Sequence, residues 1–140
     1  KTFLSITKQD IEVLFSKYSA LNEPYIGLQG IKRLSDRSVY YGEWKGNEKY
    51  GRGIQCWLDG SRYEGYFVKD IQSIRGTLFH GDGSQYEGQF KEGRANGYGV
   101  YSHADGTVYQ GFWKDDKQNG EGKEVWSDGS MYEGIFIDNM

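Results

Sequence analysis

Several residue types are scarce in this 140-residue sequence, and each scarcity removes a class of protein. The only cysteine, Cys56, excludes an internal disulfide and a zinc site built from several cysteines, and it is consistent with a reducing, intracellular setting. The only proline, Pro24, stands beside 21 glycines, so the glycines do not mark a disordered Pro/Gly-rich chain. No apolar run approaches the length that spans a bilayer, and the first residues carry no signal-peptide pattern.

Positive charge is scarce as well. The sequence holds 17 Lys and Arg against 20 Asp and Glu, a net charge of −3. Within residues 40–140 the imbalance is larger, with 11 basic and 16 acidic residues. A nucleic-acid-binding protein carries a basic patch, and electrostatic docking on anionic lipid needs clustered Lys and Arg. We therefore expect no nucleic-acid partner, and the charge argues against membrane binding by electrostatics alone.

Aromatic residues are what the sequence has in excess. They make up 16% of the chain, while all hydrophobic residues together reach only 36%, so large rings carry the apolar surface. The rings recur every 23 residues in a Tyr-x-Gly-x-aromatic motif. Its tyrosines are Tyr40, Tyr63, Tyr86, Tyr109 and Tyr132; its glycines are Gly42, Gly65, Gly88, Gly111 and Gly134; its last rings are Trp44, Phe67, Phe90, Trp113 and Phe136.

Two glycine motifs share this period. Gly-x-Gly recurs at 51–53, 97–99 and 120–122, and Ile74 replaces its first glycine in the remaining repeat. Asp-Gly-Ser/Thr recurs at 59–61, 82–84, 105–107 and 128–130. A fixed period of this length predicts a repeat architecture. We expect Ile74 to mark a widened or differently aimed hairpin, with Ile71 and Ile74 as an apolar edge patch that contacts a partner.

Each repeat has the pattern of a β-hairpin. Its two segments alternate with period two, as strands do, and Asp-Gly turns or charged loops separate them. The fold class expected is mainly β: an elongated, twisted, single-layer antiparallel sheet of consecutive hairpins, with one N-terminal α-helix as a cap. One face carries the tyrosines, glycines and Trp/Phe rings. The other carries a mostly acidic column: Glu64, Glu87, Gln110 and Glu133.

This pattern resembles the MORN repeat, whose consensus is Tyr-x-Gly-x-aromatic, Gly-x-Gly and Asp-Gly at this period. The resemblance covers about two-thirds of the chain. It divides the sequence into an N-terminal cap (1–29) and a repeat sheet (30–140). The sheet comprises a degenerate half-repeat (30–39), repeats that start at residues 40, 63, 86 and 109, and a partial repeat (132–140).

The ends of the chain lead to two further expectations. Because the sequence begins at Lys1 and stops inside a repeat, we expect a piece of a longer protein, with targeting information missing at either end. The last strand then has an unpaired edge, which either continues the ribbon in a longer protein or favours self-association.

Apolar residues ahead of the repeats recur with helical spacing and predict a helix from about Thr7 to Leu21. Thr7 with Asp10 three residues later matches a capping box. Pro24 ends the helical region, because the residue before a proline disfavours helical dihedral angles. We expect this helix to cap the first strands of the sheet, with a partner-binding helix as the alternative.

The aromatic ladder is the candidate site. A single-layer sheet has no second layer over it, so an aromatic face left partly open is a binding groove by default. Aromatic side chains are also the preferred hot spots where a groove binds a peptide or helix. We predict that this groove is lined by Trp44, Trp57, Phe67, Leu78, Phe90, Tyr101, Trp113 and Trp126. The tyrosines and glycines of the motif are assigned a structural role, with rings lying over bare glycine backbone.

Other reactive groups have simpler explanations. His80 and His103 share a column with Trp57 and Trp126, and the two strands between them separate them by about 9–10 Å, too far for joint zinc ligation. We predict that both histidines pack as rings. Cys56 is predicted to be a packed, unreactive thiol.

Acidic loops and glycine motifs also lack catalytic features. Asp70, Asp115 and Asp116 have the pattern of solvated turn residues rather than of a buried catalytic pair. The glycine motifs adjoin strands and open no helix, so they are not phosphate loops. The sequence predicts no enzyme, no cofactor and no metal.

The residues and the resemblance together favour a non-catalytic protein–protein interaction module. The resemblance implies a scaffold, because MORN-repeat proteins occur in ciliary and flagellar radial spokes, parasite cytoskeletal rings and junctional membrane proteins. It implies a cytoplasmic location in the cytoskeleton, a cilium or a flagellum. Two alternatives stay open. One is a phosphoinositide- or membrane-binding module; the other is an accessory domain of a larger enzyme, as in lipid kinases and a histone methyltransferase with similar repeats.

Overall fold

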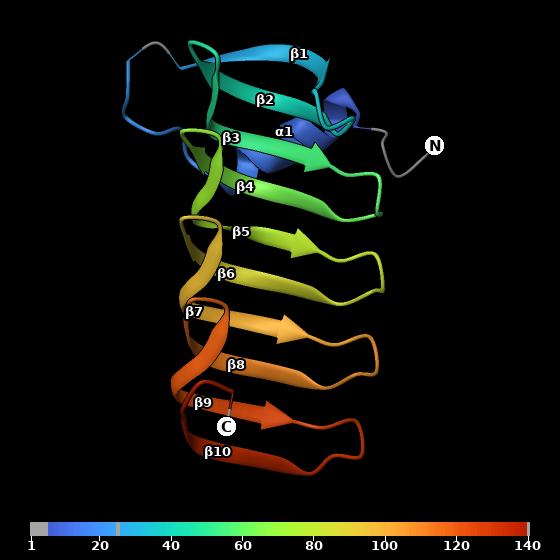
Figure 1. Ribbon diagram of the computed structural model, residues 1–140, viewed down its shortest axis with the longest axis vertical. Helices are drawn as coiled ribbons and strands as arrows, with labels where there is room; N and C mark the ends of the chain where they lie inside the picture. The colour runs from blue at the N-terminus through green and yellow to red at the C-terminus, as the bar shows by residue number, and fades with distance from the viewer. Residues whose placement is uncertain (1–5, 25, 140) are drawn as a thin grey trace.

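The computed structural model describes residues 6–24 and 26–139, which form one open sheet of ten antiparallel strands and one helix (Figure 1). The strands lie in the sheet in chain order, so each pairs with its sequence neighbours. The helix is α1 (Lys8–Lys17). The strands are β1 (Gly27–Arg33), β2 (Val39–Lys45), β3 (Glu48–Cys56), β4 (Arg62–Val68), β5 (Ile71–Phe79), β6 (Gln85–Lys91), β7 (Arg94–Ser102), β8 (Val108–Lys114), β9 (Lys117–Val125) and β10 (Met131–Phe136).

This arrangement confirms the predicted mainly β, single-layer sheet of hairpins. β1 begins at Gly27, three residues before the predicted half-repeat, and pairs with β2. The predicted ranges 1–29 and 132–140 also contain residues 1–5, Tyr25 and Met140, which lie outside the described residues. Among the described strands, β1 and β10 form the two edges of the sheet.

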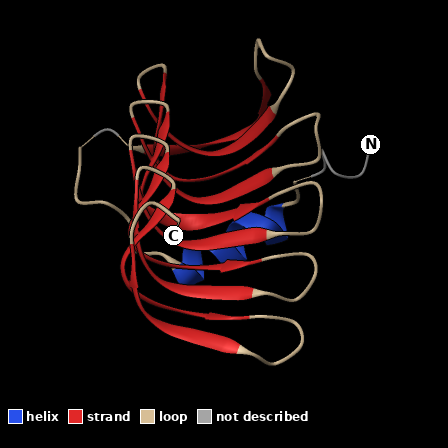
Figure 2. Cartoon of the chain, turned by 60° about the horizontal axis from the view of Figure 1, so that its bottom comes forward, coloured by secondary structure: helices blue, strands red, loops and turns tan. Residues whose placement is uncertain are grey.

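The glycines form one column across the sheet. Glycine faces glycine at each junction from β2 to β10: Gly42↔Gly53, Gly53↔Gly65, Gly65↔Gly76, Gly76↔Gly88, Gly88↔Gly99, Gly99↔Gly111, Gly111↔Gly122 and Gly122↔Gly134. A β-carbon on Gly65 would stand only 2.5 Å from the α-carbon of Gly76. Figure 2 shows that the strands are bent rather than flat, and a column without side chains permits such bending.

Each hairpin carries the same irregularity. Beside the glycine pair, one residue of the first strand faces three of the second, so the second strand bulges. A left-handed residue marks the bulge: Gly51, Ile74, Gly97 or Gly120. Ile74 adopts the conformation of the glycine it replaces, at φ 65°, and Gly76 keeps its register with Gly65. The prediction of a widened hairpin was therefore wrong; Ile71 and Ile74 are both exposed, and their contact with a partner stays a prediction.

The helix α1 lies against one face of the sheet beside its first strands (Figures 1 and 2). Thr7 and Asp10 form the predicted capping box. The helix ends at Lys17 rather than near Leu21, because Tyr18 is already extended (φ −122°, ψ 134°) and packs against the sheet. Within the described residues, no helix is long and apolar enough to cross a membrane.

Candidate interaction surfaces

The face that carries the tyrosines is filled by its own rings. The ring of Tyr63 meets Phe67 edge-on at 5.1 Å between centroids, and meets Phe90 of the next repeat at 5.2 Å. Its hydroxyl donates a 2.8 Å hydrogen bond to the carbonyl oxygen of Tyr66. Burial raises the pKa of the Tyr63 hydroxyl well above its ordinary value. Edge-to-face pairs of this kind add to the burial of ring area, so this face is the main core of the protein.

The same contacts run the length of the sheet. Ring pairs within and between repeats connect Tyr40, Trp44, Phe67, Phe90, Tyr86, Trp113, Tyr109, Phe136 and Tyr132. The motif's other hydroxyls donate to the carbonyl three residues on, as Tyr40 does to Glu43 and Tyr109 does to Phe112. The structural role predicted for the tyrosines and glycines matches this packing.

The eight residues predicted to line a groove divide into two sets. The first set lies in the core and is at most 9% exposed: Trp44, Phe67, Phe90 and Trp113. The second set lies outside the core. Three of its members are partly buried against the core, namely Trp57, Leu78 and Tyr101, and the fourth, Trp126, is 39% exposed. The space in which an open groove was expected is thus occupied by the ladder itself, because facing glycines let the rings close over the backbone. Partner binding by these eight residues stays a prediction.

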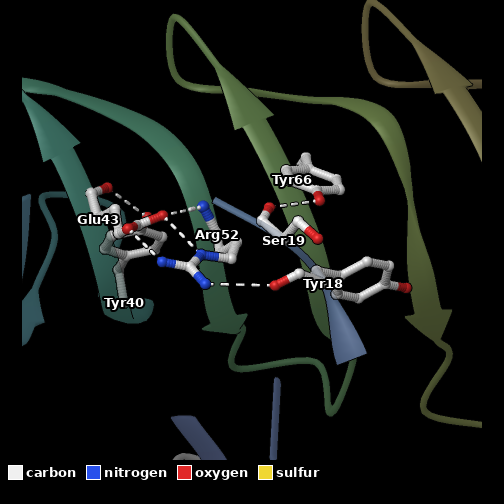
Figure 3. Close-up of polar contacts among 6 residues, drawn as sticks. All are labelled: Tyr18, Ser19, Tyr40, Glu43, Arg52 and Tyr66. Carbon is white, nitrogen blue, oxygen red and sulfur yellow. Dashed lines mark hydrogen bonds and ion pairs between the residues drawn. The ribbon is translucent and has the colours of Figure 1, made fainter. Parts of the chain in front are cut away.

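The opposite face holds a second cluster, in which α1 is seated. Ile11 and Leu14 of the helix and Tyr18 after it are buried against side chains of this face, Tyr66 among them. The Tyr66 hydroxyl donates a 2.6 Å hydrogen bond to the carbonyl oxygen of Ser19 (Figure 3). Tyr18 and Tyr66 also meet edge-on at 5.2 Å. The segment after Lys17 therefore leaves the helix in order to bind the sheet.

A buried ion pair joins the helix segment to β2 and β3. The guanidinium of Arg52 donates to both carboxylate oxygens of Glu43, at 3.1 and 2.8 Å, and to the carbonyl oxygen of Tyr18 at 3.2 Å (Figure 3). It also stacks on the ring of Phe15, 3.7 Å from the centroid. Both partners of the pair are nearly buried, and hydrogen bonds of this kind offset the cost of desolvating them.

Beyond α1, this face is open. A depression of about 370 Å³ begins at Tyr18 and extends to Tyr98. A second depression of about 480 Å³ begins at Tyr98 and extends over β8 to β10, where Phe112 and Ile135 line it. Tyr98 and Phe112 meet edge-on at 5.6 Å, yet they and Ile135 are 43%, 46% and 57% exposed. We call the two depressions together the outer furrow. The helix α1 covers the same face of the sheet beside its first strands.

Acidic groups accompany the apolar residues of the outer furrow. Glu87 lines the first depression together with Lys17 and Arg75, and it receives the ammonium of Lys17 at 3.0 Å. Glu121 and Glu133 line the second, with Lys123 as its one cation among the described residues. The contact of Lys17 shows how a basic residue on a helix is received by the acidic column of this face.

Comparison with known families identifies the repeats. The MORN repeat family matches residues 40–62, 86–108 and 109–131. These three segments are MORN repeats. The unmatched interval, 63–85, is the MORN repeat in which Ile74 replaces glycine, and it retains the hairpin register of the others. MORN repeats form non-catalytic modules that interact with proteins or membranes, and no catalytic family is indicated.

Two further comparisons add little. No match was found among curated proteins. Among solved structures, a catalytically inactive variant of virginiamycin B lyase from Staphylococcus aureus, crystallised with quinupristin, is similar at 14% identity and a TM-score of 0.19. The similarity covers 84% of this chain and 44% of that one.

Successive MORN repeats are held together by a contact that sequence reasoning missed. The backbone N–H of Ala95 donates to the Oδ1 atom of Asp116 at 2.7 Å, and the N–H of Asp116 donates back to the carbonyl oxygen of Ala95 at 3.0 Å. The same two-way clamp joins Lys49 to Asp70 and Gln118 to Asn139. Asp70 and Asp116 are solvent-exposed, as predicted for turn residues, but their hydrogen bonds to the neighbouring repeat were not predicted. The sequence contains a signal of this clamp, because Asp or Asn stands at three of four positions spaced 23 residues apart: Asp70, Gly93, Asp116 and Asn139.

The isolated reactive groups are packed as the sequence predicts. His80 and His103 both meet the ring of Tyr101 edge-on, at 6.1 and 4.5 Å. Cys56 is fully buried beneath α1, and burial raises the pKa of its thiol. A thiol with a raised pKa carries little thiolate, so Cys56 is poorly suited to act as a nucleophile.

Proposed function

We propose that this chain is a non-catalytic protein–protein interaction module whose binding surface is the outer furrow. The observation that carries the proposal is the exposure of Tyr98, Phe112 and Ile135 on a face that α1 covers elsewhere. Exposed aromatic side chains that line a depression are the usual anchors of a protein interface. The rings of the aromatic ladder are buried in the core, so they offer less exposed surface to a partner than the outer furrow does.

The partner proposed for the outer furrow is an amphipathic α-helix with basic residues beside its apolar stripe. The seat of α1 supports a helix, since Ile11, Leu14 and Tyr18 show that a helical segment with its apolar extension packs on this face. The charge of the second depression supports basic flanks, because two carboxylates, Glu121 and Glu133, line it with one cation among the described residues, Lys123. In the first depression, Glu87 already pairs with Lys17 and Arg75 lies beside it. The same carboxylates disfavour an anionic lipid headgroup.

Two peptides test this proposal. One carries Ile, Leu and Tyr at the spacing found in α1 and lysines beside them; the other carries glutamates in place of those lysines. Fluorescence anisotropy measures their binding to the whole chain. We expect the lysine peptide to bind more tightly, and the double variant Phe112→Ala/Ile135→Ala to weaken its binding by about tenfold or more, as the loss of interface anchors does.

A matched control separates the furrow from general surface stickiness. Leu58 is 48% exposed but lies beside an Asp-Gly turn, so Leu58→Ala should leave peptide binding unchanged. Equal binding by the double variant and the unmodified chain would overturn the proposal. Sedimentation with phosphoinositide vesicles tests the alternative: vesicle binding without peptide binding would assign the module to membranes instead.

The cellular setting is a separate part of the proposal. We place the protein in the cytoplasm, in a cytoskeletal, ciliary or flagellar assembly, and the support is the resemblance to MORN-repeat scaffolds. Imaging of the tagged protein in ciliated cells tests this setting, and a diffuse distribution that detergent extraction removes would contradict it. Self-association through the edge of β10 stays a prediction, which sedimentation velocity checks.

A further inference from the structure

A small cavity on the rim of the aromatic core belongs to neither surface described above. Its volume is about 260 Å³. The residues that line it are His80, Tyr86, Ala95, Tyr101, Trp113 and Asp116. Tyr86, Ala95 and Trp113 are buried, whereas His80 and Tyr101 are half-buried and Asp116 is exposed, so the cavity opens to solvent beside the carboxylate.

The repeat pattern shows what occupies the equivalent place two repeats earlier. Lys49 stands 46 residues before Ala95, and its ammonium lies 5.9 Å from the ring centroid of Tyr40 and 5.8 Å from that of Phe67. The same ammonium is 3.5 Å from Oδ1 of Asp70, and the lysine side chain is only 12% exposed. Two rings and a carboxylate thus hold a cation, as cation–π and ion-pair interactions favour.

Every other part of that arrangement is present around Ala95. Tyr86, Trp113 and Asp116 stand 46 residues after Tyr40, Phe67 and Asp70. Asp116 is fixed in the same way, since its Oδ1 accepts the N–H of Ala95 as Asp70 accepts that of Lys49. Only the lysine is missing, because alanine takes its position.

The rings around the cavity are better cation acceptors than those around Lys49. Tryptophan replaces phenylalanine, and its π face attracts a cation more strongly. Tyr101 adds a third ring, where Gln55 stands two repeats earlier. The ring centroid of Trp113 lies 5.3 Å from that of Tyr86 and 6.1 Å from that of Tyr101, and both pairs are close to perpendicular. The cavity therefore has walls of different orientation rather than a single flat surface.

We propose that this cavity binds an alkylammonium group supplied from outside the chain, such as a free or methylated lysine side chain or a small amine. The group fills the place that Lys49 fills in its own repeat. Its charge faces Asp116 and the rings of Tyr86, Tyr101 and Trp113, while its alkyl part replaces water against Ala95. Anions are disfavoured by Asp116, and a neutral group leaves the carboxylate without a counter-charge.

The experiment is an NMR titration of the whole chain, read at the indole N–H of Trp113 and the amide of Ala95. The probes are a short peptide with trimethyl-lysine, the same peptide with lysine or with norleucine, and the free amines choline and putrescine. We expect shifts with the ammonium probes and none with norleucine. Shifts with the lysine peptides alone assign the site to a protein partner; shifts with the free amines as well assign it to alkylammonium groups in general.

Two variants complete the test. Ala95→Lys places the chain's own ammonium in the cavity, as Lys49 does, and should abolish binding. Asp116→Asn removes the charge and keeps the clamp, because Asn139 makes that same clamp to Gln118; it should weaken binding by about tenfold. Absence of binding by all ammonium probes, equal shifts with norleucine, or full binding by both variants would overturn the proposal. Thermal unfolding of each variant confirms that it is folded.

Discussion

The ring of Tyr63 lies directly on the backbone of Gly76, so that a β-carbon on this glycine would stand 2.6 Å from Cζ of the tyrosine. No side chain other than hydrogen fits there without moving the ring from its contacts with Phe67 and Phe90. The contact is repeated for Tyr40 on Gly53 and for Tyr109 on Gly122. The core of this single-layer sheet consists of such contacts, and they predict which glycines are replaceable.

We expect Gly76→Ala to lower the free energy of unfolding by about 2 kcal/mol or more, because overpacking a rigid core displaces ring and backbone together. Gly30→Ala is the matched control: Gly30 also lies in a strand, and a β-carbon there would meet nothing within 4 Å. Its effect should stay within about 0.5 kcal/mol. Urea unfolding followed by circular dichroism measures both, and equal losses would contradict the packing described.

The backbone strain at Ile74 leads us to predict a stabilising substitution. Its φ of 65° is strained for a β-branched residue, whereas Gly51, Gly97 and Gly120 occupy the equivalent positions without strain. Removing the strain is worth about 1–2 kcal/mol, and the added freedom of glycine in the unfolded chain takes back about 0.5–1 kcal/mol. We therefore expect Ile74→Gly to raise the unfolding free energy by about 0.5–1 kcal/mol. Ile71→Gly, at an equally exposed position without this strain, should lower it.

The incomplete clamp at Gly93, between two successive repeats, leads us to predict a second stabilising substitution. Gly93 donates its N–H to the carbonyl oxygen of Gln72 at 2.9 Å, but it has no side chain to accept the N–H of Gln72 in return. Its φ of 81° is close to the 76° of Asn139, which makes the complete clamp. Within 4 Å, a β-carbon there would meet only Cγ2 of Ile71, at 3.3 Å, and the side-chain oxygen of Gln72, at 3.6 Å.

We expect Gly93→Asn to raise the unfolding free energy by about 0.5–1 kcal/mol, the net value of one hydrogen bond. Gly93→Ala separates this effect from loss of backbone freedom. Alanine tolerates the left-handed region poorly and accepts no hydrogen bond, so it should destabilise the sheet. Thermal unfolding of the two variants side by side gives the answer; stabilisation by both would show that the clamp is not the cause.

Much of this fold follows from the sequence because the repeat supplies the same information five times. The 23-residue spacing from Tyr40 to Tyr132 sets the strands and their order, and alternation about Gly65 assigns side chains to faces. Alternation does not reveal which face is filled. Alternation places the rings of Tyr63 and Phe67 on one face, whether that face is an open groove or a packed core. The rings close into a core because Gly65 approaches Gly76 closely.

The candidate sites depend on contacts between residues far apart in the sequence. Tyr18 leaves the helix for Tyr66, 48 residues on, and a local helical pattern contains no information about this contact. The outer furrow is open because α1 covers one end of the face and not the other. The cavity at Ala95 is visible only when the repeat is compared with the one that contains Lys49, where the ammonium is in place.

The aspartates of the Asp-Gly-Ser/Thr loops predict the response of the sheet to acid. In each loop, Oδ1 of the aspartate accepts the N–H of the residue two positions on, as Asp59 does for Ser61 at 2.9 Å. Hydrogen bonds from this residue hold the pKa of the carboxyl below its ordinary value of 3.8 in all four of these loops, at Asp59, Asp82, Asp105 and Asp128. The same holds for Asp36 in the related loop Asp36-Arg37-Ser38.

A carboxyl whose pKa is lower in the folded state than in the unfolded state stabilises the fold when ionised. Its contribution is complete above the unfolded pKa near 3.8, and it is lost as the pH falls below that value through the folded pKa. We expect the unfolding midpoint in urea to drop as the pH is lowered below about 4. Asp59→Asn/Asp82→Asn keeps two acceptor oxygens but removes two titrating groups, so its midpoint should fall less steeply over the same range. Parallel curves for this variant and the unmodified chain would show that other carboxyls set the acid response.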